Sequence, residues 1–561
     1  MEESLQVIPQ YAAVCCVTVV IAWFLHWAYN EWVSSPPCKE KRLPPGSMGF
    51  PIIGETLQFF KTSHSIDILP SYYRQRLNSF FFNWTMRRIG DLGYGGEKLT
   101  STRYGPVFKT SLVGQPLVIS LDPEFNRGQV VQELVPRDGK QNLRQDGTVH
   151  KFTRSLTSKL FGPENLKETL IGELEVSMKQ SFAAWAAEPS IEVKDSVADM
   201  IFDLMSKKMI SMGPEESREL RKNFEDFFKG ILCFPIYFPG SSFYKCMKGR
   251  RHVHKKLTHL LKDRLSTPEK KYGDLLDPVV EELRSEKPVI DETFAIDALA
   301  ALLFGSFATI SGTLTIGLKL LTDNPDVVKT LKEEHETILK KREDTNARFT
   351  WEEYKSLTFT TQVMNEINRL SNVAPGIFRK ALTDVQVNGY TIPAGWLVMI
   401  CTMATHLNPT LFEDPLKFNP WRWTVIKRYF WFVFNMLRLY HMTRCALYPQ
   451  TQDETKRSML QRNFMPFGGG IRLCLGADFS KLFISLFLHV LVANYRFNFF
   501  SVGSYMCVPT WFKYFIRVNL CSPLIWNSPV CRWNEIKGGE VIRVGGMLIP
   551  KDYHIQLFPT T

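Results

Sequence analysis

A glycine-rich stretch around one cysteine constrains this 561-residue chain more than any other feature. Residues 467–476 read Phe-Gly-Gly-Gly-Ile-Arg-Leu-Cys-Leu-Gly. Glycines let the backbone turn tightly, so that amide hydrogens of the turn can point at the sulfur of Cys474. A thiolate held in this way is an axial ligand of haem iron, where it favours O–O bond cleavage. A glycine-rich turn beside a buried structural cysteine is the simpler alternative, but the match at several fixed positions favours haem.

The neighbours of Cys474 predict how such a cofactor would be held. Arg472 lies two residues before the cysteine, where a guanidinium can bind a haem propionate. We expect Phe467 to cover the sulfur and exclude water, and Gly470 and Gly476 to contribute to the tight turn. The sequence therefore predicts Cys474 as the metal ligand and the surrounding residues as its haem-binding loop.

Composition narrows the class of protein and its compartment. A hydrophobic fraction of 45% and a charged fraction of 22% are typical of a globular protein with ample core material. The net charge of +12 suits an acidic partner or an anionic membrane surface. No nucleic-acid reader motif accompanies this charge, so we expect no nucleic-acid partner. The 11 cysteines are odd in number and include no CxxC pair, which favours a reducing compartment over a disulfide framework.

The N-terminal segment predicts a membrane anchor. No Asp, Glu, Lys or Arg occurs from Leu5 to Asn30, a run long enough to cross a bilayer as a helix. Acidic residues precede the run and basic residues follow it, which places the rest of the chain in the cytosol. The basic start and cleavage site of a signal peptide are not evident. We expect a transmembrane anchor at 1–33, a proline-rich hinge at 34–54 and one catalytic domain at 55–561.

Helical signals dominate that domain. Asn324 and Pro325 predict an N-cap and first-turn proline for a helix that ends near 343. Thr350 and Glu353 form a capping-box pattern. The expected fold class is mostly α with small β-sheets. A long buried helix is expected at about 291–321, and short alternating strands are expected near 107–121 and 385–400.

Three charged residues provide an independent clue. Glu366 and Arg369 are three apart on one helical face, a pattern that alone indicates only an ordinary ion pair. A second arginine, Arg422, follows within Phe-Asn-Pro-Trp-Arg-Trp. Taken with Cys474 in this order, the chain resembles the cytochrome P-450 family. In that fold the three charged side chains interlock behind the haem, and the resemblance implies the same structural network here.

The resemblance implies further site residues. Arg379 stands where the family has a propionate-binding arginine, and His150 and Arg154 resemble the pair on the family's haem-contacting helix. A solvated basic residue is the alternative for all three. Thr309 corresponds to the family's oxygen-activating threonine. Residues 373–378 and the central helix are implied to line the substrate pocket.

The hinge, residues 320–423 and the haem loop resemble the plant clan that oxidises sterols, brassinosteroids and triterpenoids, and are closest to the family numbered eighty-seven. This implies a haem-thiolate monooxygenase (iron protoporphyrin IX) that hydroxylates a sterol- or triterpenoid-like substrate with O₂, anchored in the endoplasmic reticulum membrane with its catalytic domain facing the cytosol. Electrons are expected from NADPH through a separate flavoprotein reductase, since the chain has no Rossmann-type dinucleotide motif. Membrane lipid and a small hydrophobic substrate are the other expected partners.

The oxygen-activating turn departs from the family pattern. Ala308 stands where an acid normally precedes the threonine, and an alanine cannot relay a proton. A route through water past Thr309 remains open. So do two other readings: a haem-thiolate rearrangement enzyme that needs neither O₂ nor NADPH, and an inactive haem-binding membrane protein.

Three aromatic-rich segments also interrupt the resemblance, at about 78–102, 424–452 and 497–531, while the stretch 132–149 appears shorter than the family's loop over the pocket. They are either membrane-dipping or partner-binding loops, or translated introns that accompany a lost exon. Long unpatterned loops inside a compact domain favour the second explanation. Full-length transcripts that retain all three segments would exclude it.

Overall fold

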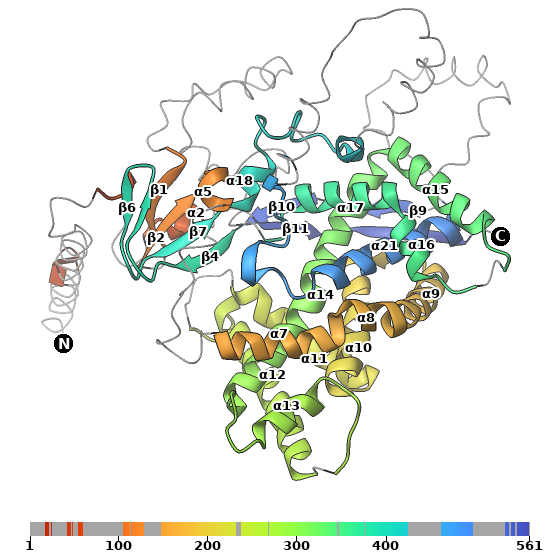
Figure 1. Cartoon of the computed structure of the whole chain (residues 1–561), viewed down its shortest axis with the longest axis horizontal. Coiled ribbons are helices and arrows are strands. Elements are labelled where there is room, and N and C mark those ends of the chain that lie inside the picture. Colours follow the sequence, from red (N-terminus) through yellow and green to blue (C-terminus); the bar gives the residue numbers. More distant parts are fainter. Residues whose placement is uncertain are drawn as a thin grey trace, which may run out of the picture.

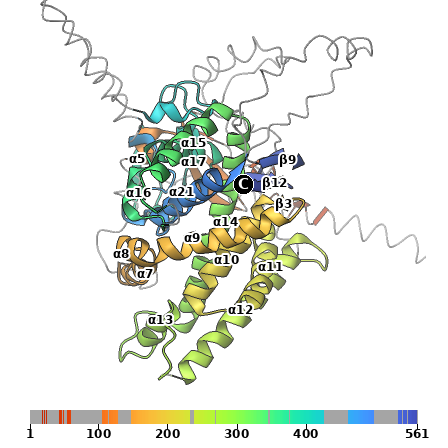
Figure 2. The ribbon, with the colours of Figure 1, turned by 90° about the vertical axis from the view of Figure 1, so that its right-hand side faces the viewer.

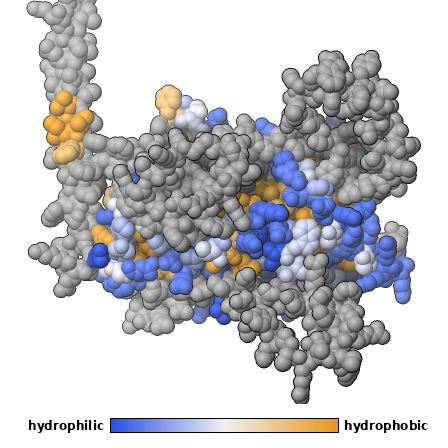
Figure 3. Space-filling view, turned by 90° about the horizontal axis from the view of Figure 1, so that it is seen from above, coloured by the Kyte–Doolittle hydropathy of each residue, from blue (hydrophilic) through white to orange (hydrophobic). Residues whose placement is uncertain are grey.

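A computed structural model of the chain describes residues 17–18, 20–21, 24, 42–46, 48, 54–59, 105–112, 114–127, 147–231, 237–267, 269–344, 347–374, 376–424, 460, 462–496, 533–537, 540–544 and 547–559. The insert-like segments at 78–102 and 497–531 lie outside these residues, as do 424–452 apart from Thr424 and most of the stretch 132–149. Within the predicted anchor, Val17, Val20, Ile21 and Phe24 are helical and exposed. Figure 3 shows a hydrophobic patch on this N-terminal segment.

The described part is mostly helical, with small sheets gathered at the periphery (Figure 1), as the sequence predicted. The described helices are α2 (Thr56–Phe59), α5 (Pro123–Arg127), α7 (Gly147–Phe161), α8 (Pro163–Asn165), η1 (Leu166–Leu170), α9 (Ile171–Ala187), α10 (Val193–Ile210), α11 (Pro214–Ile231), α12 (Ser242–Ser266), α13 (Leu276–Leu283), α14 (Glu292–Thr322), α15 (Pro325–Lys340), α16 (Trp351–Ser356), α17 (Thr358–Ser371), α18 (Thr402–His406), η2 (Pro420–Trp423), η3 (Gly470–Arg472) and α21 (Ala477–Asn494). Figure 2 shows α11 and α12 side by side as a long pair.

The helix ends follow the local sequence signals with one exception. The Thr350 hydroxyl accepts from the Glu353 amide at 3.2 Å, and the Glu353 carboxylate accepts from the Thr350 amide at 2.8 Å, so the predicted capping box is present. Pro325 begins α15 as expected. Asn324 stands at the predicted N-cap position, but its side chain makes no capping hydrogen bond and its amide donates to the Leu320 carbonyl of the preceding helix at 2.7 Å.

The main sheet has the order β1-β2-β7-β4, and only the β2–β7 pair is parallel. Part of the predicted hinge lies along it, because the Lys109 amide donates to the Pro45 carbonyl at 2.9 Å. Gly46 has φ +153°, and a Cβ there would lie 2.0 Å from the Lys109 carbonyl oxygen, so only glycine fits. The described strands are β1 (Val107–Leu112), β2 (Gln115–Ser120), β3 (Ile191–Glu192), β4 (Ile377–Lys380), β5 (Val385–Val387), β6 (Tyr390–Ile392), β7 (Leu397–Ile400), β8 (Tyr495–Arg496), β9 (Trp533–Lys537), β10 (Glu540–Val544), β11 (Met547–Lys551) and β12 (His554–Pro559).

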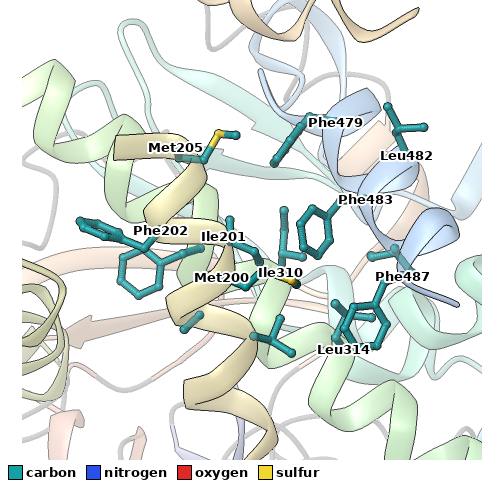
Figure 4. Close-up of a cluster of buried hydrophobic side chains, with 14 of the residues drawn as sticks. Met200, Ile201, Phe202, Met205, Ile310, Leu314, Phe479, Leu482, Phe483 and Phe487 are labelled. Carbon is teal, nitrogen blue, oxygen red and sulfur yellow. The ribbon is translucent and has the colours of Figure 1, made fainter. Parts of the chain in front are cut away.

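The core lies where α10, α14 and α21 meet (Figure 4). Phe202 of α10, Ile310 of α14 and Phe483 of α21 are all buried there. Among the described residues, α14 and α21 are the two helices long and apolar enough to cross a membrane, and both contribute heavily to this core. The central helix predicted at 291–321 is α14. Because much of it is buried in the core, it holds one wall of the site in place.

Two buried histidines join α15, α17 and α21. His335 Nε2 lies 3.0 Å from the Thr360 hydroxyl, which itself donates to Glu334 at 2.6 Å. The Thr360 oxygen therefore accepts from His335, whose free Nδ1 accepts from His489 Nδ1 at 3.0 Å. Burial lowers the pKa of His335 to about 4 and lowers the pKa of His489 well below its usual value, with the charge of His335 adding to the second effect. Both rings are therefore neutral at physiological pH.

This pair predicts a loss of stability in mild acid. Between pH 6.5 and about 4 these histidines bind protons in the unfolded chain but not in the folded chain. The free energy of unfolding therefore falls as the pH falls. The slope is at most about 1.4 kcal/mol per pH unit for each histidine. Urea unfolding at pH 7 and pH 5 measures it. The double replacement of His335 and His489 by leucine should flatten the slope, whereas replacing the exposed His259 by asparagine should not; an unchanged slope in the double variant would contradict the assignment.

Candidate active site around Cys474

The cysteine loop turns where the sequence predicted, with one difference. Gly468 and Gly470 have φ values of +75° and +67°, in the left-handed region that favours glycine. The Cys474 amide donates to the Phe467 carbonyl at 3.0 Å and closes the loop just before α21. Gly476 was expected to contribute to the tight turn, but its φ of −94° is open to any residue. Its contribution is its amide, which hydrogen-bonds the sulfur of Cys474.

The thiol of Cys474 faces open space while protein surrounds its other sides. The residue is exposed, yet burial of the sulfur's surroundings raises the pKa of the thiol. The hydrogen bond from the Gly476 amide and the positive charge of Arg154 act in the opposite direction and favour the thiolate. A cysteine that is open on one side and supported by donors on the other is placed to bind a ligand rather than to fill a core.

The open space is a cavity of ≈ 270 Å³. It brings together five residues singled out from the sequence: Thr309, Arg379, Phe467, Arg472 and Cys474. They come from α14, β4 and the cysteine loop. Its remaining lining residues are Ile310, Thr313, Asn368, Ser371, Asn372, Val373, Ala374, Ile377, Thr402, His406, Met465, Pro466, Gly468, Ser480 and Ile484, which include much of the predicted 373–378 segment.

His150 and Arg154 of α7 lie beside this cavity rather than in its wall. Both terminal nitrogens of Arg154 donate to the Leu473 carbonyl, at 3.3 and 3.4 Å, directly before the cysteine. Burial lowers the pKa of His150, and the charges of Arg472 and Arg154 lower it further. The structure thus places α7 against the cysteine loop. Gly470 and Gly476 also lie outside the cavity wall.

The charge of this region suits an anion. Burial lowers the pKa of Arg379, and the nearby positive charge of Arg472 lowers it further. The Arg379 guanidinium donates to the neighbouring Phe378 carbonyl at 2.9 Å, and within the described part of the chain most of its donors remain for another partner. Arg154 and His150 add two more basic groups nearby. A haem fits these residues, because its two propionates would neutralise the cluster while the Cys474 sulfur would bind the iron.

Behind the loop, Glu366 joins the two arginines as the sequence predicted. Its Oε1 accepts from Arg369 Nη2 at 2.8 Å and from Arg422 Nε at 2.9 Å. Arg369 is fully buried and also donates to the carbonyls of His406 and Pro415, at 2.9 and 2.6 Å. This network ties α17 to η2 and to the segment after α18.

The cavity wall beside Thr309 can be compared with the family pattern. Among the described residues that line the cavity, none is acidic. The Thr309 hydroxyl donates to the Gly305 carbonyl one turn back at 3.0 Å, so its oxygen lone pairs remain for a water or ligand. Ala308 is partly buried against the core and offers no polar atom. Within the described part of the cavity wall, no other acid takes the place of the one missing at Ala308.

Sequence reasoning missed the polar residues on the α17 side. Asn368, Ser371, Asn372 and His406 all line the cavity. Asn368 Nδ2 is buried without a hydrogen-bond partner. The positions 368, 371 and 372 share one helical face, a spacing that could have indicated their common direction. His406 carried no motif at all.

Comparison with known proteins shows the family of this chain. The family model described as cytochrome P-450 matches residues 97–505. Cytochrome P-450 87A3 of Oryza sativa subsp. japonica is 39% identical over 98% of this chain and 91% of its own length. Cucurbitadienol 11-hydroxylase of Siraitia grosvenorii is 36% identical over 87% of this chain and 94% of its own. Beta-amyrin 16-alpha-hydroxylase CYP87D16 of Maesa lanceolata is 34% identical, over 88% and 95%.

A solved structure, retinoic acid bound cyanobacterial CYP120A1, superposes with a TM-score of 0.62 over 93% of this chain and 100% of that one, at 21% identity. It shows the shared fold. Because the family match spans most of the chain and the relatives align over nearly all of their own length, the chain belongs to the cytochrome P-450 family.

Proposed function

We propose that this protein is a haem-thiolate monooxygenase that hydroxylates a triterpenoid or sterol skeleton. The observation that carries the proposal is Cys474, whose thiol opens into a cavity walled by Arg379 and Arg472. Two relatives are named as hydroxylases of cucurbitadienol and beta-amyrin, which supports a large polycyclic hydrocarbon as substrate. The family membership supports the monooxygenase reaction.

The chain's own residues take distinct parts. Cys474 would hold the haem iron through its thiolate, and the haem, when bound, would supply the activation of O₂ for insertion into a C–H bond. Arg472 and Arg379 would hold the propionates, with Arg154 and His150 beside them. Phe467 would keep water from the sulfur.

Three further roles complete the proposal. Gly470 provides the turn of the loop and Gly476 the amide at the sulfur. Glu366, Arg369 and Arg422 would hold the loop's support rigid. Thr309 would position the water that delivers protons, since its hydroxyl hydrogen is donated to the Gly305 carbonyl and its oxygen lone pairs can accept from a water in the cavity.

The remaining assignments concern where the enzyme works. We propose a single anchor at 1–33 in the endoplasmic reticulum membrane, a hinge at 34–54 and a cytosolic catalytic domain at 55–561. The exposed apolar side chains of Val17, Val20, Ile21 and Phe24 support the anchor. An NADPH-dependent flavoprotein reductase would supply electrons, and the net charge of +12 suits an acidic docking face.

The full chain should be expressed with a plant P-450 reductase in microsomes and supplied with cucurbitadienol, beta-amyrin and cholesterol. The expected result is a product heavier by one oxygen atom, formed only with NADPH and O₂. Label from ¹⁸O₂ should enter the product. A product formed without NADPH would indicate the rearrangement chemistry instead. A normal thiolate spectrum without any turnover would favour an inactive haem protein.

Restoring the missing acid is expected to improve coupling. In the Ala308→Asp variant a carboxyl group would stand beside Thr309 and shuttle protons that water alone now delivers. The ratio of product to NADPH consumed should rise several-fold, and peroxide release should fall. The Ala308→Asn variant has nearly the same size but no exchangeable carboxyl proton, so it should not improve coupling. Equal ratios in the two variants would contradict a role for proton supply.

A further inference from the structure

His406 ends α18 and reaches the cavity from a buried position. It is 1% exposed, and its ring is among the cavity's lining residues. Both ring nitrogens have partners, on two different segments of the chain. The proposed function assigns it no task. A buried histidine with two fixed hydrogen bonds holds its neighbours in one relative position.

The hydrogen-bond pattern determines where the ring proton sits. The Met465 amide can only donate, and it lies 3.1 Å from His406 Nε2, so Nε2 must be unprotonated. The hydrogen is therefore on Nδ1, which donates to Asn372 Oδ1 at 3.3 Å. The Asn372 amide nitrogen donates in turn to the Arg369 carbonyl at 3.0 Å. Every donor in this chain meets an acceptor, and the neutral ring is the form that fits. Burial, helped by the charge of Arg369, lowers the pKa of His406 to about 3.

The same residue is tied to the ion network through its backbone. The His406 carbonyl accepts from Arg369 Nη1 at 2.9 Å. On its other side the ring lies 5.5 Å from the ring of Phe464, the residue before Met465. Met465 begins the segment that continues through Phe467, whose carbonyl accepts from the Cys474 amide at 3.0 Å. One residue therefore contacts the rigid network and the start of the cysteine loop together.

We propose that His406 is a positioning residue for the iron ligand, which fixes the start of the loop at 465–474 against the Glu366–Arg369 network. The inference rests on the proposed role of Cys474 as ligand. His406 does not touch the reacting atoms. It acts through the Met465 amide, because a buried N–H that loses its acceptor must move to find another one. Movement there is transmitted through Pro466 and Phe467 to the cysteine amide.

Two amide replacements separate this role from ordinary core packing. In His406→Gln the side-chain oxygen reaches the place of Nε2 and can still accept from Met465. In His406→Asn the shorter amide can still donate towards Asn372 but leaves the Met465 amide without an acceptor. Both variants remove the ring and its packing on Phe464. The two variants therefore exchange the bonds: glutamine keeps the acceptor for Met465 and gives up the donor to Asn372, and asparagine does the reverse. If asparagine is the more damaging replacement, the bond to Met465 is the one that positions the loop.

The measurement uses the haem-loaded full chain in detergent. The reduced carbon-monoxide complex reports thiolate ligation, and its decay to the thiolate-free spectrum is followed at a fixed temperature. We expect His406→Asn to lose the thiolate signal about tenfold faster than the unchanged protein, the factor that corresponds to one lost buried hydrogen bond. His406→Gln should stay within about twofold of the unchanged protein, which is less than a third of that free energy.

His335→Asn is the matched control, because His335 is equally buried and neutral but bonds to His489 and Thr360 instead. It should lower the melting temperature without accelerating thiolate loss. Equal rates for His406→Asn and His406→Gln, or acceleration by His335→Asn as well, would overturn the proposal. If His406→Asn does not fold, Asn372→Ala removes the acceptor of the Nδ1 hydrogen, which lets the ring turn away from the Met465 amide. That variant should also accelerate thiolate loss, and an unchanged rate in it would overturn the proposal. Absence of a thiolate signal in the unchanged protein would instead refute Cys474 as the ligand.

Discussion

Replacing Glu366 with glutamine is expected to lower the free energy of unfolding so far that most of the protein no longer folds. The carboxylate is fully buried, and its Oε1 accepts from Arg369, Arg422 and the Asn419 amide at 2.8, 2.9 and 3.0 Å. Its Oε2 accepts from Arg369 Nε and from the Trp423 indole, both at 2.9 Å. Glutamine keeps one oxygen and turns an amino group towards these donors. It also leaves the charge of Arg369 buried without a counter-charge.

The expected loss of stability is large relative to the total free energy of unfolding of a protein. Breaking a buried ion pair from one side costs about 3–5 kcal/mol, compared with a total stability of about 5–15 kcal/mol. Burial raises the pKa of Glu366, but the hydrogen bonds and charges of Arg369 and Arg422 outweigh it and hold the pKa below its usual value. The carboxylate is thus charged in the folded protein, and glutamine cannot replace that charge.

Urea unfolding of microsomal protein, followed by tryptophan fluorescence, measures this effect. The control is Glu281→Gln, which makes the same chemical change in an exposed ion pair with Lys271. That variant should unfold at the urea concentration of the unchanged protein. If Glu366→Gln unfolded there as well, the network would not be the support that its contacts indicate.

Replacing Cys474 with serine is expected to abolish the thiolate spectrum and all turnover while leaving the fold intact. The cysteine side chain opens into the cavity, so its sulfur contributes little to the core. The loop closes through the backbone bond between the Cys474 amide and the Phe467 carbonyl, which serine retains. A serine hydroxyl does not ionise at physiological pH, so it cannot act as the thiolate does.

The reduced carbon-monoxide difference spectrum and product formation with NADPH test this expectation, with circular dichroism as the check on folding. The control is Cys246→Ala in α12, which removes a buried structural cysteine far along the chain from the loop. That variant should keep both spectrum and activity. A thiolate spectrum that persisted in Cys474→Ser would assign the iron ligand to another residue.

The sequence predicted the parts of the site whose chemistry depends on residue type at a fixed spacing. Cys474, Arg472 and the glycines before them lie within ten residues, so local pattern was enough to place them together. The capping box of α16 was predictable for the same reason, since Thr350 and Glu353 satisfy each other within one turn. Glu366, Arg369 and Arg422 were joined through the family resemblance, because a pair separated by 56 residues leaves no local signal.

What escaped prediction depends on contacts between distant elements. His406 could not be predicted from the sequence, because each of its partners belongs to another segment and no regular spacing relates residue 406 to residue 465. The unpaired amide of Asn368 and the φ of Gly476 are likewise properties of the folded backbone. Asn324 is the N-cap residue as predicted, but its side chain makes no capping bond because its amide donates to the Leu320 carbonyl at the end of the preceding helix.

Trp423 and Phe464, which flank a long stretch of the chain, are in contact. Their rings lie 4.6 Å apart, Trp423 is held by Glu366 at 2.9 Å, and Thr424 donates to Gln362 at 2.8 Å. Closing a loop across ends that are already held costs only about 0.6 kcal/mol for each doubling of its length. Chain length can therefore vary here during evolution without moving the iron ligand. For the same reason, a reporter domain or affinity tag inserted between these two ends should disturb the site little.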